Sequence, residues 1–253
     1  KEWVRRRWVA WAGDEAGVLK LVRKLECLPL AIDQAAAFSR EWKIATPELY
    51  LEAQAKRTKT LEAQWEIILK RGYPFFFFEV VSHTFMTLAE AGDKNSVGAI
   101  NLLKKMAFLH SEGIQQDLFQ EDEWIHVSTL KRHSLVVDSH APGHLGGMSI
   151  NVLVQDVVRE QLMGRSKIVA LGGVMQALKT AIEGLDRECT ATHEVGRRYA
   201  RHVKAAASHV PREGDSQDSD GDLRLALVWC DEARQWLEKG AAILADGVGQ
   251  NEQ

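Results

Sequence analysis

The chain of 253 residues is 45% hydrophobic and 26% charged, which suits one large or two small globular domains and excludes disorder as the dominant state. Its net charge of −3 provides no global attraction to nucleic acid or acidic membranes. The 3 cysteines form no CxxC pair, which indicates a reducing, intracellular setting with buried thiols. Few prolines and many Ala, Leu, Glu and Lys residues favour a mainly helical fold.

The ends of the chain and its apolar runs bear on location. Residues 1–11 (KEWVRRRWVAW) are basic but lack an uninterrupted apolar region, so we expect no signal peptide. No apolar run approaches the roughly 20 residues of a membrane span, and we expect a cytoplasmic protein without a membrane partner. Because the sequence begins with Lys1, we expect a piece of a longer protein or a processed one.

Helix signals dominate the first hundred residues. Asp14 is a plausible N-cap for an amphipathic helix, and Pro29 suits the first turn of a helix over 30–40 that is rich in alanine. Thr46-Pro47-Glu48 begins a helix that we expect to end near residue 57, and another follows over about 60–70. An aromatic-rich helix then extends to Glu90, and Ser96 begins the next one.

The hydrophobic period changes after residue 133. A short helix near 115–119 and a longer one over Asp122–His133 precede two β-like runs, 134–137 and 148–154, around a Gly/Pro/His loop at 138–147. Helices followed at once by a hairpin are typical of a winged helix. Further helices are predicted, in chain order, over 155–163, 166–185, 189–209 and 223–245.

These signals predict a mainly α fold in five parts. We expect a helical subdomain at 1–92, a winged helix at 93–163, a helical bridge at 164–210, an acidic linker at 211–222 and a C-terminal helix at 223–253. The linker holds five acids against one arginine, and the last helix could begin a series of tetratricopeptide-like repeats.

Motifs for catalysis or metal binding are missing. The sequence has no GxxxxGK[ST] P-loop, no HExxH and no G-x-S-x-G elbow, so we expect no enzyme activity from this chain by itself. His133, His140 and His144 around the hairpin loop could take zinc, but histidines in such a loop are more often solvated. Cys189 with His193 makes a still weaker site, and we expect no metal.

Binding of nucleic acid is also disfavoured. The helix that would enter the major groove begins with Glu121, Asp122 and Glu123, which would repel phosphates. A basic set on the helix over 189–209 (Arg197, Arg198, Arg201 and Lys204) reads more simply as a solvated face than as a site for an acidic partner.

Four segments, in order, resemble the NB-ARC family of STAND signal-transduction ATPases, above all its fungal and bacterial branch. Residues 25–37 (LECLPLAIDQAAA) resemble the GLPLA segment, and Ala107–Leu109 with Gly113-Ile114 resembles the family's "AFL…I". Residues 130–136 (LKRHSLV) are similar to the entry into its winged helix, and residues 149–159 (SINVLVQDVVR) to the stretch that contains the MHD motif. The resemblance covers roughly residues 15–163.

This resemblance implies a nucleotide switch in which a separate P-loop domain binds ADP or ATP and the helical and winged-helix parts clamp it. Pro29 and Leu30 would face the nucleotide, Pro29 near the adenine. Asn151 stands where the family has the histidine that senses the β-phosphate, and Cys27 stands where the family has glycine. Asparagine donates a neutral hydrogen bond only, so the lock on ADP should be weaker.

The leading hypothesis is therefore the regulatory and interaction portion of a STAND-type switch. Its partners would be an intramolecular P-loop domain, other copies of itself on activation, and proteins bound through the C-terminal helices. We expect ADP or ATP to bind only when the P-loop domain is present, and we expect no cofactor to bind to this chain alone. Two alternatives are a free-standing helical interaction scaffold whose nucleotide role has decayed, and a winged-helix nucleic-acid-binding protein.

Overall fold

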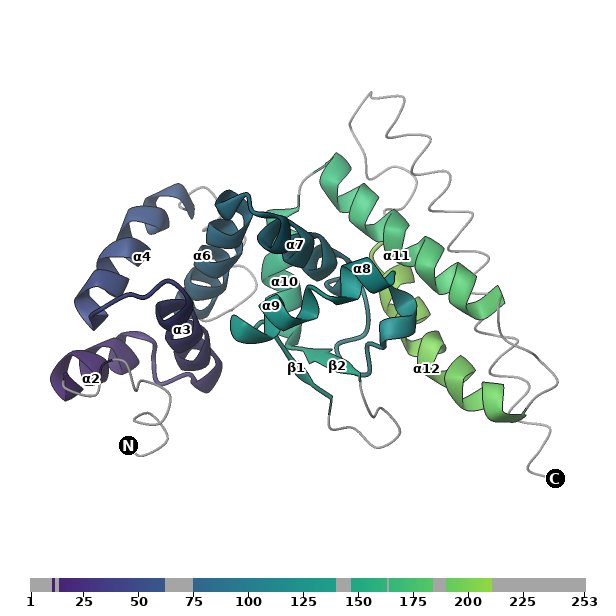
Figure 1. Cartoon of the computed structure of the whole chain (residues 1–253), viewed down its shortest axis with the longest axis horizontal. Helices are drawn as coiled ribbons and strands as arrows, with labels where there is room; N and C mark the ends of the chain where they lie inside the picture. Colours follow the sequence, from purple (N-terminus) through teal and green to yellow (C-terminus); the bar gives the residue numbers. More distant parts are fainter. Residues whose placement is uncertain are drawn as a thin grey trace. The chain divides into compact units, whose positions relative to one another are not determined.

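The computed structural model describes residue 11 and residues 14–61, 75–139, 147–162, 164–183 and 190–210. Within these ranges the chain is mainly helical and carries one small antiparallel sheet of two strands, which confirms the mainly α prediction (Figure 1). The predicted acidic linker and C-terminal helix, and most of the predicted helix over 60–70, lie outside the described residues.

The elements follow one another in the order that the helix and turn signals predict. The helices and strands of the described ranges are α2 (Glu15–Lys24), α3 (Pro29–Glu41), α4 (Pro47–Leu61), α6 (Phe75–Ala91), α7 (Lys94–Met106), η3 (Gln116–Leu118), α8 (Glu121–Trp124), α9 (Val127–Arg132), β1 (Val136–Asp138), β2 (Met148–Ile150), α10 (Val152–Gln161), α11 (Arg165–Glu183) and α12 (Thr190–Ala207).

Two compact units divide the chain. The first unit comprises residues 1–100 and 126–136, and the second unit comprises residues 101–125 and 137–253. The units are therefore not two consecutive halves of the sequence, because α9 belongs to the first unit although it follows residues of the second.

A tight turn joins the first two helices of the first unit, α2 and α3. The Asp14 carboxylate accepts a hydrogen bond from the Gly17 N–H at 2.9 Å, which confirms Asp14 as the N-cap of α2. Glu26 and Cys27 then adopt positive φ values of 52° and 57°, and Pro29 occupies the first turn of α3. The Cys27 thiol is exposed, so the prediction of buried thiols is wrong for this cysteine, while the other two lie outside the described side chains.

Helix α3 packs against α6 through its small residues. The alanines of α3 are buried, as their spacing predicts, and they let the two helices approach closely. Toward the C-terminal half of α3, the Phe38 ring lies 4.4 Å from that of His83 on α6 and 5.9 Å from that of Tyr50 on α4, between ring centroids. This aromatic cluster ties three helices together, since each ring pair adds to the free energy gained by burial alone.

The predicted long helix over Asp122–His133 is wrong. The structure has two short helices, α8 and α9, separated by Ile125 and His126. The residues at and after this break, Ile125 to Thr129, are β-branched, His or Ser, all weak helix formers. Packing also favours the break, because the His126 imidazole is buried directly against Gly98 of α7.

The second unit is organised around the C-terminal end of α7. The Gln155 side chain on α10 is buried, and its Nε2 donates to the carbonyl oxygens of Met106 at 2.9 Å and Leu109 at 2.8 Å. Arg159, one turn later, donates to the carbonyl oxygen of Ala107. These bonds provide donors to backbone acceptors at the end of α7, where the Met106 carbonyl oxygen also accepts a hydrogen bond from the Leu109 N–H at 3.2 Å.

The predicted hairpin exists but is shorter than expected. Strand β1 pairs with β2, and Ile114 forms an additional antiparallel bridge with Met148, with N···O distances of 2.9 and 2.7 Å. The predicted run to residue 154 is wrong after Ile150, because Asn151 caps a helix that starts at Val152 and not at Gln155. The cap hydrogen bond outcompetes the β propensity of the valines that follow it.

Candidate functional site

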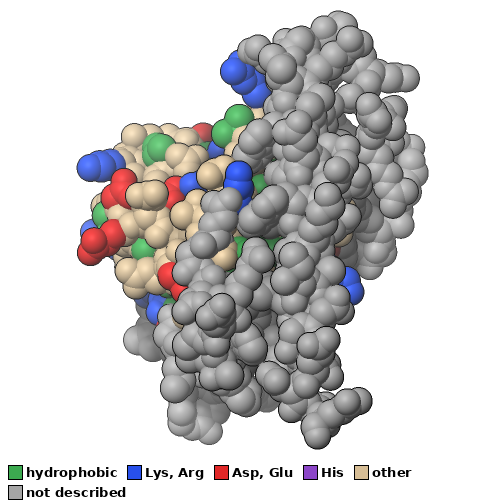
Figure 2. Space-filling view, turned by 90° about the vertical axis from the view of Figure 1, so that its right-hand side faces the viewer, with side chains coloured by type: hydrophobic (Ala, Val, Ile, Leu, Met, Phe, Trp, Pro, Cys, Tyr) green, Lys and Arg blue, Asp and Glu red, His purple; other side chains and the backbone are tan. Residues whose placement is uncertain are grey.

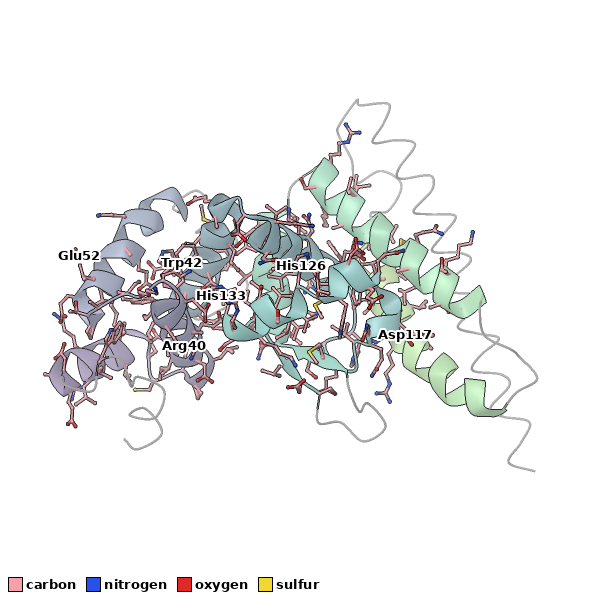
Figure 3. The ribbon with its side chains drawn as sticks, viewed as in Figure 1. Arg40, Trp42, Glu52, Asp117, His126 and His133 are labelled. Atoms are coloured by element: carbon pink, nitrogen blue, oxygen red, sulfur yellow. The ribbon has the colours of Figure 1, made fainter. Side chains whose placement is uncertain are left out.

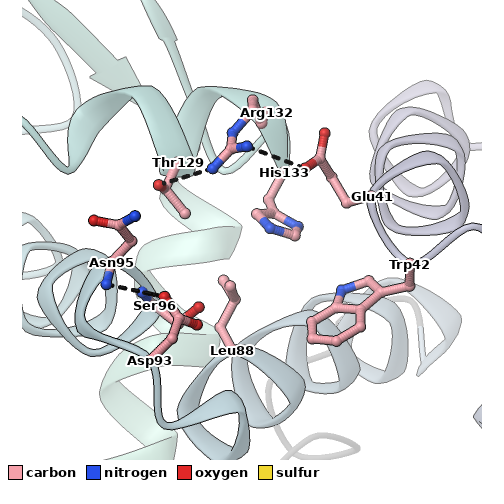
Figure 4. Close-up of a pocket in the computed structure, with 9 residues that line it drawn as sticks. All are labelled: Glu41, Trp42, Leu88, Asp93, Asn95, Ser96, Thr129, Arg132 and His133. Carbon is pink, nitrogen blue, oxygen red and sulfur yellow. Dashed lines mark hydrogen bonds and ion pairs between the residues drawn. The ribbon is translucent and has the colours of Figure 1, made fainter.

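An open pocket with a volume of about 170 Å³ lies in the first unit, where α3, α6, α7 and α9 meet (Figure 4). Its lining combines both signs of charge with neutral polar groups and two apolar side chains. The lining residues are Glu41, Trp42, Leu88, Asp93, Asn95, Ser96, Thr129, Arg132 and His133.

Helix geometry explains which side chains meet in the pocket. Thr129, Arg132 and His133 are spaced i, i+3, i+4, so they share one face at the C-terminal end of α9. Trp42 follows the C-terminal end of α3, and Figure 3 shows it with Arg40 and His133 near that end. The floor of the pocket is buried and consists of Leu88, Ser96, Thr129 and His133, whereas the charged groups lie at the rim.

Arg132 connects the two sides of the rim. Its Nη1 lies 3.6 Å from Oε2 of Glu41, and its Nη2 donates to Oγ1 of Thr129 at 3.2 Å. Arg40 adds a second link, because its Nη2 donates to the carbonyl oxygen of Arg132 at 2.9 Å. Glu41 thus faces two guanidinium groups, with Nε of Arg40 at 3.8 Å. The guanidinium of Arg132 has five N–H donors, and these contacts engage two of its nitrogens only.

His133 is the buried ionisable group of the pocket. Burial lowers its pKa to about 4, the Glu41 charge opposes this shift, and the neighbouring Arg132 and Arg40 charges reinforce it. The imidazole is therefore neutral at pH 7. Its side chain is 4% exposed, and Nδ1 has no hydrogen-bond partner. A buried nitrogen in this state costs free energy unless something binds to it.

Asp93 forms the opposite rim and caps α7. Its Oδ1 accepts hydrogen bonds from the backbone N–H groups of Asn95 at 3.0 Å and Ser96 at 3.1 Å. Hydrogen bonds from Ser96 are the main reason that the pKa of the Asp93 carboxyl is lowered, so this group is ionised at neutral pH. The prediction that Ser96 begins this helix is wrong, because Asp93 supplies the cap and the helix starts at Lys94.

A second, larger hollow lies in the second unit and has a different character. It has a volume of about 540 Å³ and is lined by Asn101, Lys104, Lys105, Glu123, Arg165, Ser166, Val169 and Ala170. Lys105 is engaged in an ion pair with Glu123. On the described part of the face in Figure 2, acidic and basic side chains are interspersed. The groove therefore has basic character but no buried polar floor.

The predicted nucleotide-facing residues fall in both units. Pro29 is exposed at the start of α3, next to the partly exposed Leu30, and both belong to the first unit. Asn151 belongs to the second unit, where its Oδ1 accepts a hydrogen bond from the Leu153 N–H at 2.8 Å. Asn151 is exposed, so its amide NH₂ faces solvent while its oxygen caps α10.

The histidine and basic sets considered for ligand binding are only partly described. His140, His144, Cys189 and His193 lie outside the described side chains, and His133 lines the pocket of the first unit. Among the described residues, no group of three or more His, Cys, Asp or Glu side chains could hold a metal ion. Of the basic set on α12, Arg201 and Lys204 are described and exposed, and they remain consistent with a solvated face.

Helix α9 and the short helix α8 together replace the single helix that would have entered the major groove. Helix α9 has only six residues, and Val127, Thr129 and Leu130 are buried. Of its basic residues, Arg132 contacts Glu41 and Lys131 is also engaged by another group.

Sequence reasoning did not find the pocket of the first unit. The sequence pointed to His133 as a possible zinc ligand, and His133 and Arg132 otherwise stand within the segment 130–136 that resembles the NB-ARC family. Asp93 followed by Ser96 does carry a helix-start signal, which would have placed one rim of the pocket. The contact of Arg132 with Glu41 joins residues far apart in the sequence and leaves no local signal.

Comparisons with protein-family models, with curated proteins and with solved structures found no match to this chain. In the described part of the chain, no helix combines the length and apolarity needed to cross a membrane.

Proposed function

We propose that this chain is the regulatory and interaction portion of a STAND-type nucleotide switch. It would clamp ADP or ATP bound by a separate P-loop domain and control assembly with other copies. A cytoplasmic location accords with this role. The chain would not hydrolyse ATP by itself, since its sequence has no P-loop.

The order of elements after α7 is the observation that supports this proposal. Short helices lead into the β1–β2 hairpin, and α10 follows the second strand after a single residue, Asn151. The segments that resemble the NB-ARC family lie at the start of α3, at the end of α7, at the entry to β1 and across β2 and α10. Two of the four segments thus lie within the helix–hairpin–helix order, and the other two precede it.

The geometry of Asn151 bears on how strongly such a switch would hold ADP. Its carboxamide oxygen is committed to the Leu153 N–H, which leaves the NH₂ group as a neutral donor. A neutral donor contributes roughly half of what a charged one does toward a phosphate. We therefore expect a weakly locked ADP state, in which exchange of nucleotide is easier than with an imidazolium at this place.

The test is to express this chain with a P-loop domain encoded with it and to measure ADP release and assembly. Asn151→His is expected to slow ADP release by about tenfold, and Asn151→Asp, which keeps the cap but adds a negative charge, to accelerate it. Asn101→His, at an exposed position on α7, is the matched control and should leave release unchanged. Failure of the P-loop domain to associate with the chain, with or without ADP, would contradict the proposal and favour the scaffold alternative.

A further inference from the structure

We propose that the pocket of the first unit binds a small zwitterion of the α-amino-acid class, with an aliphatic side chain. The pocket in Figure 4 would bind this ligand whether or not the chain is part of a nucleotide switch. Three properties of the pocket carry it, namely its unpartnered floor, its pair of opposite charges and its size.

The floor provides a polar atom that lacks a partner within the protein. Nδ1 of His133 has no hydrogen-bond partner, although His133 is only 4% exposed to solvent. Leaving such an atom without a hydrogen bond costs about 1–3 kcal/mol. Figure 4 shows the ring directed into the space between α9 and α6, beside Leu88, where a bound molecule would meet it.

The rim provides one cation and ionised carboxylates at separate places. Arg132 retains N–H donors beyond those that contact Glu41 and Thr129. Across the pocket, Asp93 is ionised and exposed, and its hydrogen bonds to the start of α7 are made through Oδ1.

These charges discriminate among ligand classes. A simple anion such as phosphate would meet two carboxylates, Asp93 and Glu41, and has no positive group of its own to pair with either. A simple amine would meet the guanidinium of Arg132. A molecule that carries a carboxylate and an ammonium group satisfies both sides, because the carboxylate pairs with Arg132 and the ammonium with Asp93.

Size and apolar lining narrow the class further. A volume of about 170 Å³ corresponds to about five or six waters, since each occupies about 30 Å³ in the liquid. A free amino acid of the size of alanine to valine fills such a space. Leu88 on the floor and the half-exposed indole of Trp42 provide the apolar wall against which an aliphatic side chain would pack.

The test is a calorimetric titration of the full chain with L-valine, L-valinamide, N-acetyl-L-valine and inorganic phosphate. We expect L-valine to bind with a Kd of about 1 mM. L-valinamide lacks the carboxylate and N-acetyl-L-valine lacks the ammonium, so each should bind at least about tenfold more weakly. Equal binding of either derivative, tighter binding of phosphate, or no heat from L-valine up to about 10 mM would each overturn the proposal.

Variants separate recognition from folding. Arg132→Gln and His133→Leu should each weaken L-valine binding by at least about tenfold, and Arg23→Gln is the matched control, because Arg23 is exposed on α2 and outside the pocket. His133→Leu removes an unpaired buried nitrogen, so its thermal midpoint should not fall. Unchanged binding by both pocket variants would show that L-valine binds elsewhere and would refute the site.

Discussion

Two buried polar side chains, Gln155 in the second unit and His133 in the first, differ in their hydrogen bonding. In the second unit, the amide of Gln155 donates to two carbonyl oxygens at the end of α7. In the first unit, His133 is about as deeply buried, and its Nδ1 has no partner. A satisfied buried group specifies how the elements around it pack, whereas an unsatisfied one marks a place where the protein can bind something else.

The largest expected effect comes from removing the satisfied group. Gln155→Leu keeps the volume of the side chain but deletes both hydrogen bonds to Met106 and Leu109. We expect the free energy of unfolding to fall by about 3 kcal/mol, because the carbonyl oxygens stay buried without this donor. Chemical denaturation measures the loss. Gln116→Leu, at an exposed position in η3, is the control, and an equal loss in both variants would contradict the capping role of Gln155.

Lowering the pH should reduce the stability of the folded chain because of His133. The pKa of His133 is about 4 in the folded chain, below the usual value of 6.5, so the unfolded chain binds the proton more readily. Stability contributed by the neutral imidazole is therefore present above about pH 6.5 and is lost as the pH falls toward 4, by about 3 kcal/mol in all.

His133→Leu should remove this part of the pH dependence while leaving stability at pH 7 equal or slightly higher. Denaturation of the native chain and of the variant at several pH values between 7 and 4 measures the difference. His209 in the second unit also has its pKa lowered to about 4, mainly by burial, so His209→Leu is the comparison variant. If the slopes of the native chain and of His133→Leu coincide, His133 is not buried in its neutral form.

These contrasts also show what sequence could reveal. Caps and periodicity placed most helices, as with Asp14 before α2 and Pro47 at the start of α4, because those signals lie within one turn of the residues they affect. The break between α8 and α9 escaped prediction because it depends on the packing of His126 against Gly98. The pocket was not predicted for the same reason, since Glu41 and Arg132 meet only in the folded chain.

That packing of His126 on Gly98 can be tested directly. A Cβ atom at position 98 would lie 2.1 Å from Nε2 of His126, so the buried ring would have to move. We expect Gly98→Ala to lower the free energy of unfolding by about 2 kcal/mol, despite the better helix propensity of alanine.

The second unit offers a matched control for this substitution. A Cβ atom at position 173 on α11 would lie 3.2 Å from Cε of Lys105, the flexible stem of a partly exposed side chain that can shift. Gly173→Ala should therefore be neutral or stabilising by up to about 1 kcal/mol. Thermal or chemical unfolding of the two variants measures the contrast, and a larger loss for Gly173→Ala would reverse the assignment of the rigid contact to His126.

The smallest expected effect concerns two of the N-caps, one from each unit. Asp14 caps α2 and Asn151 caps α10, each by accepting a backbone N–H. Asn151→Ala should cost about 1 kcal/mol, and Asn151→Ser should restore most of it, because a hydroxyl oxygen can accept the same bond. Denaturation of the isolated chain measures this structural share of Asn151. ADP release from a complex with a P-loop domain separates the two roles of Asn151. If Asn151 contacts the nucleotide, Asn151→Ala should also change the rate of ADP release. If Asn151 acts only as a cap, the substitution should lower stability and leave ADP release unaltered.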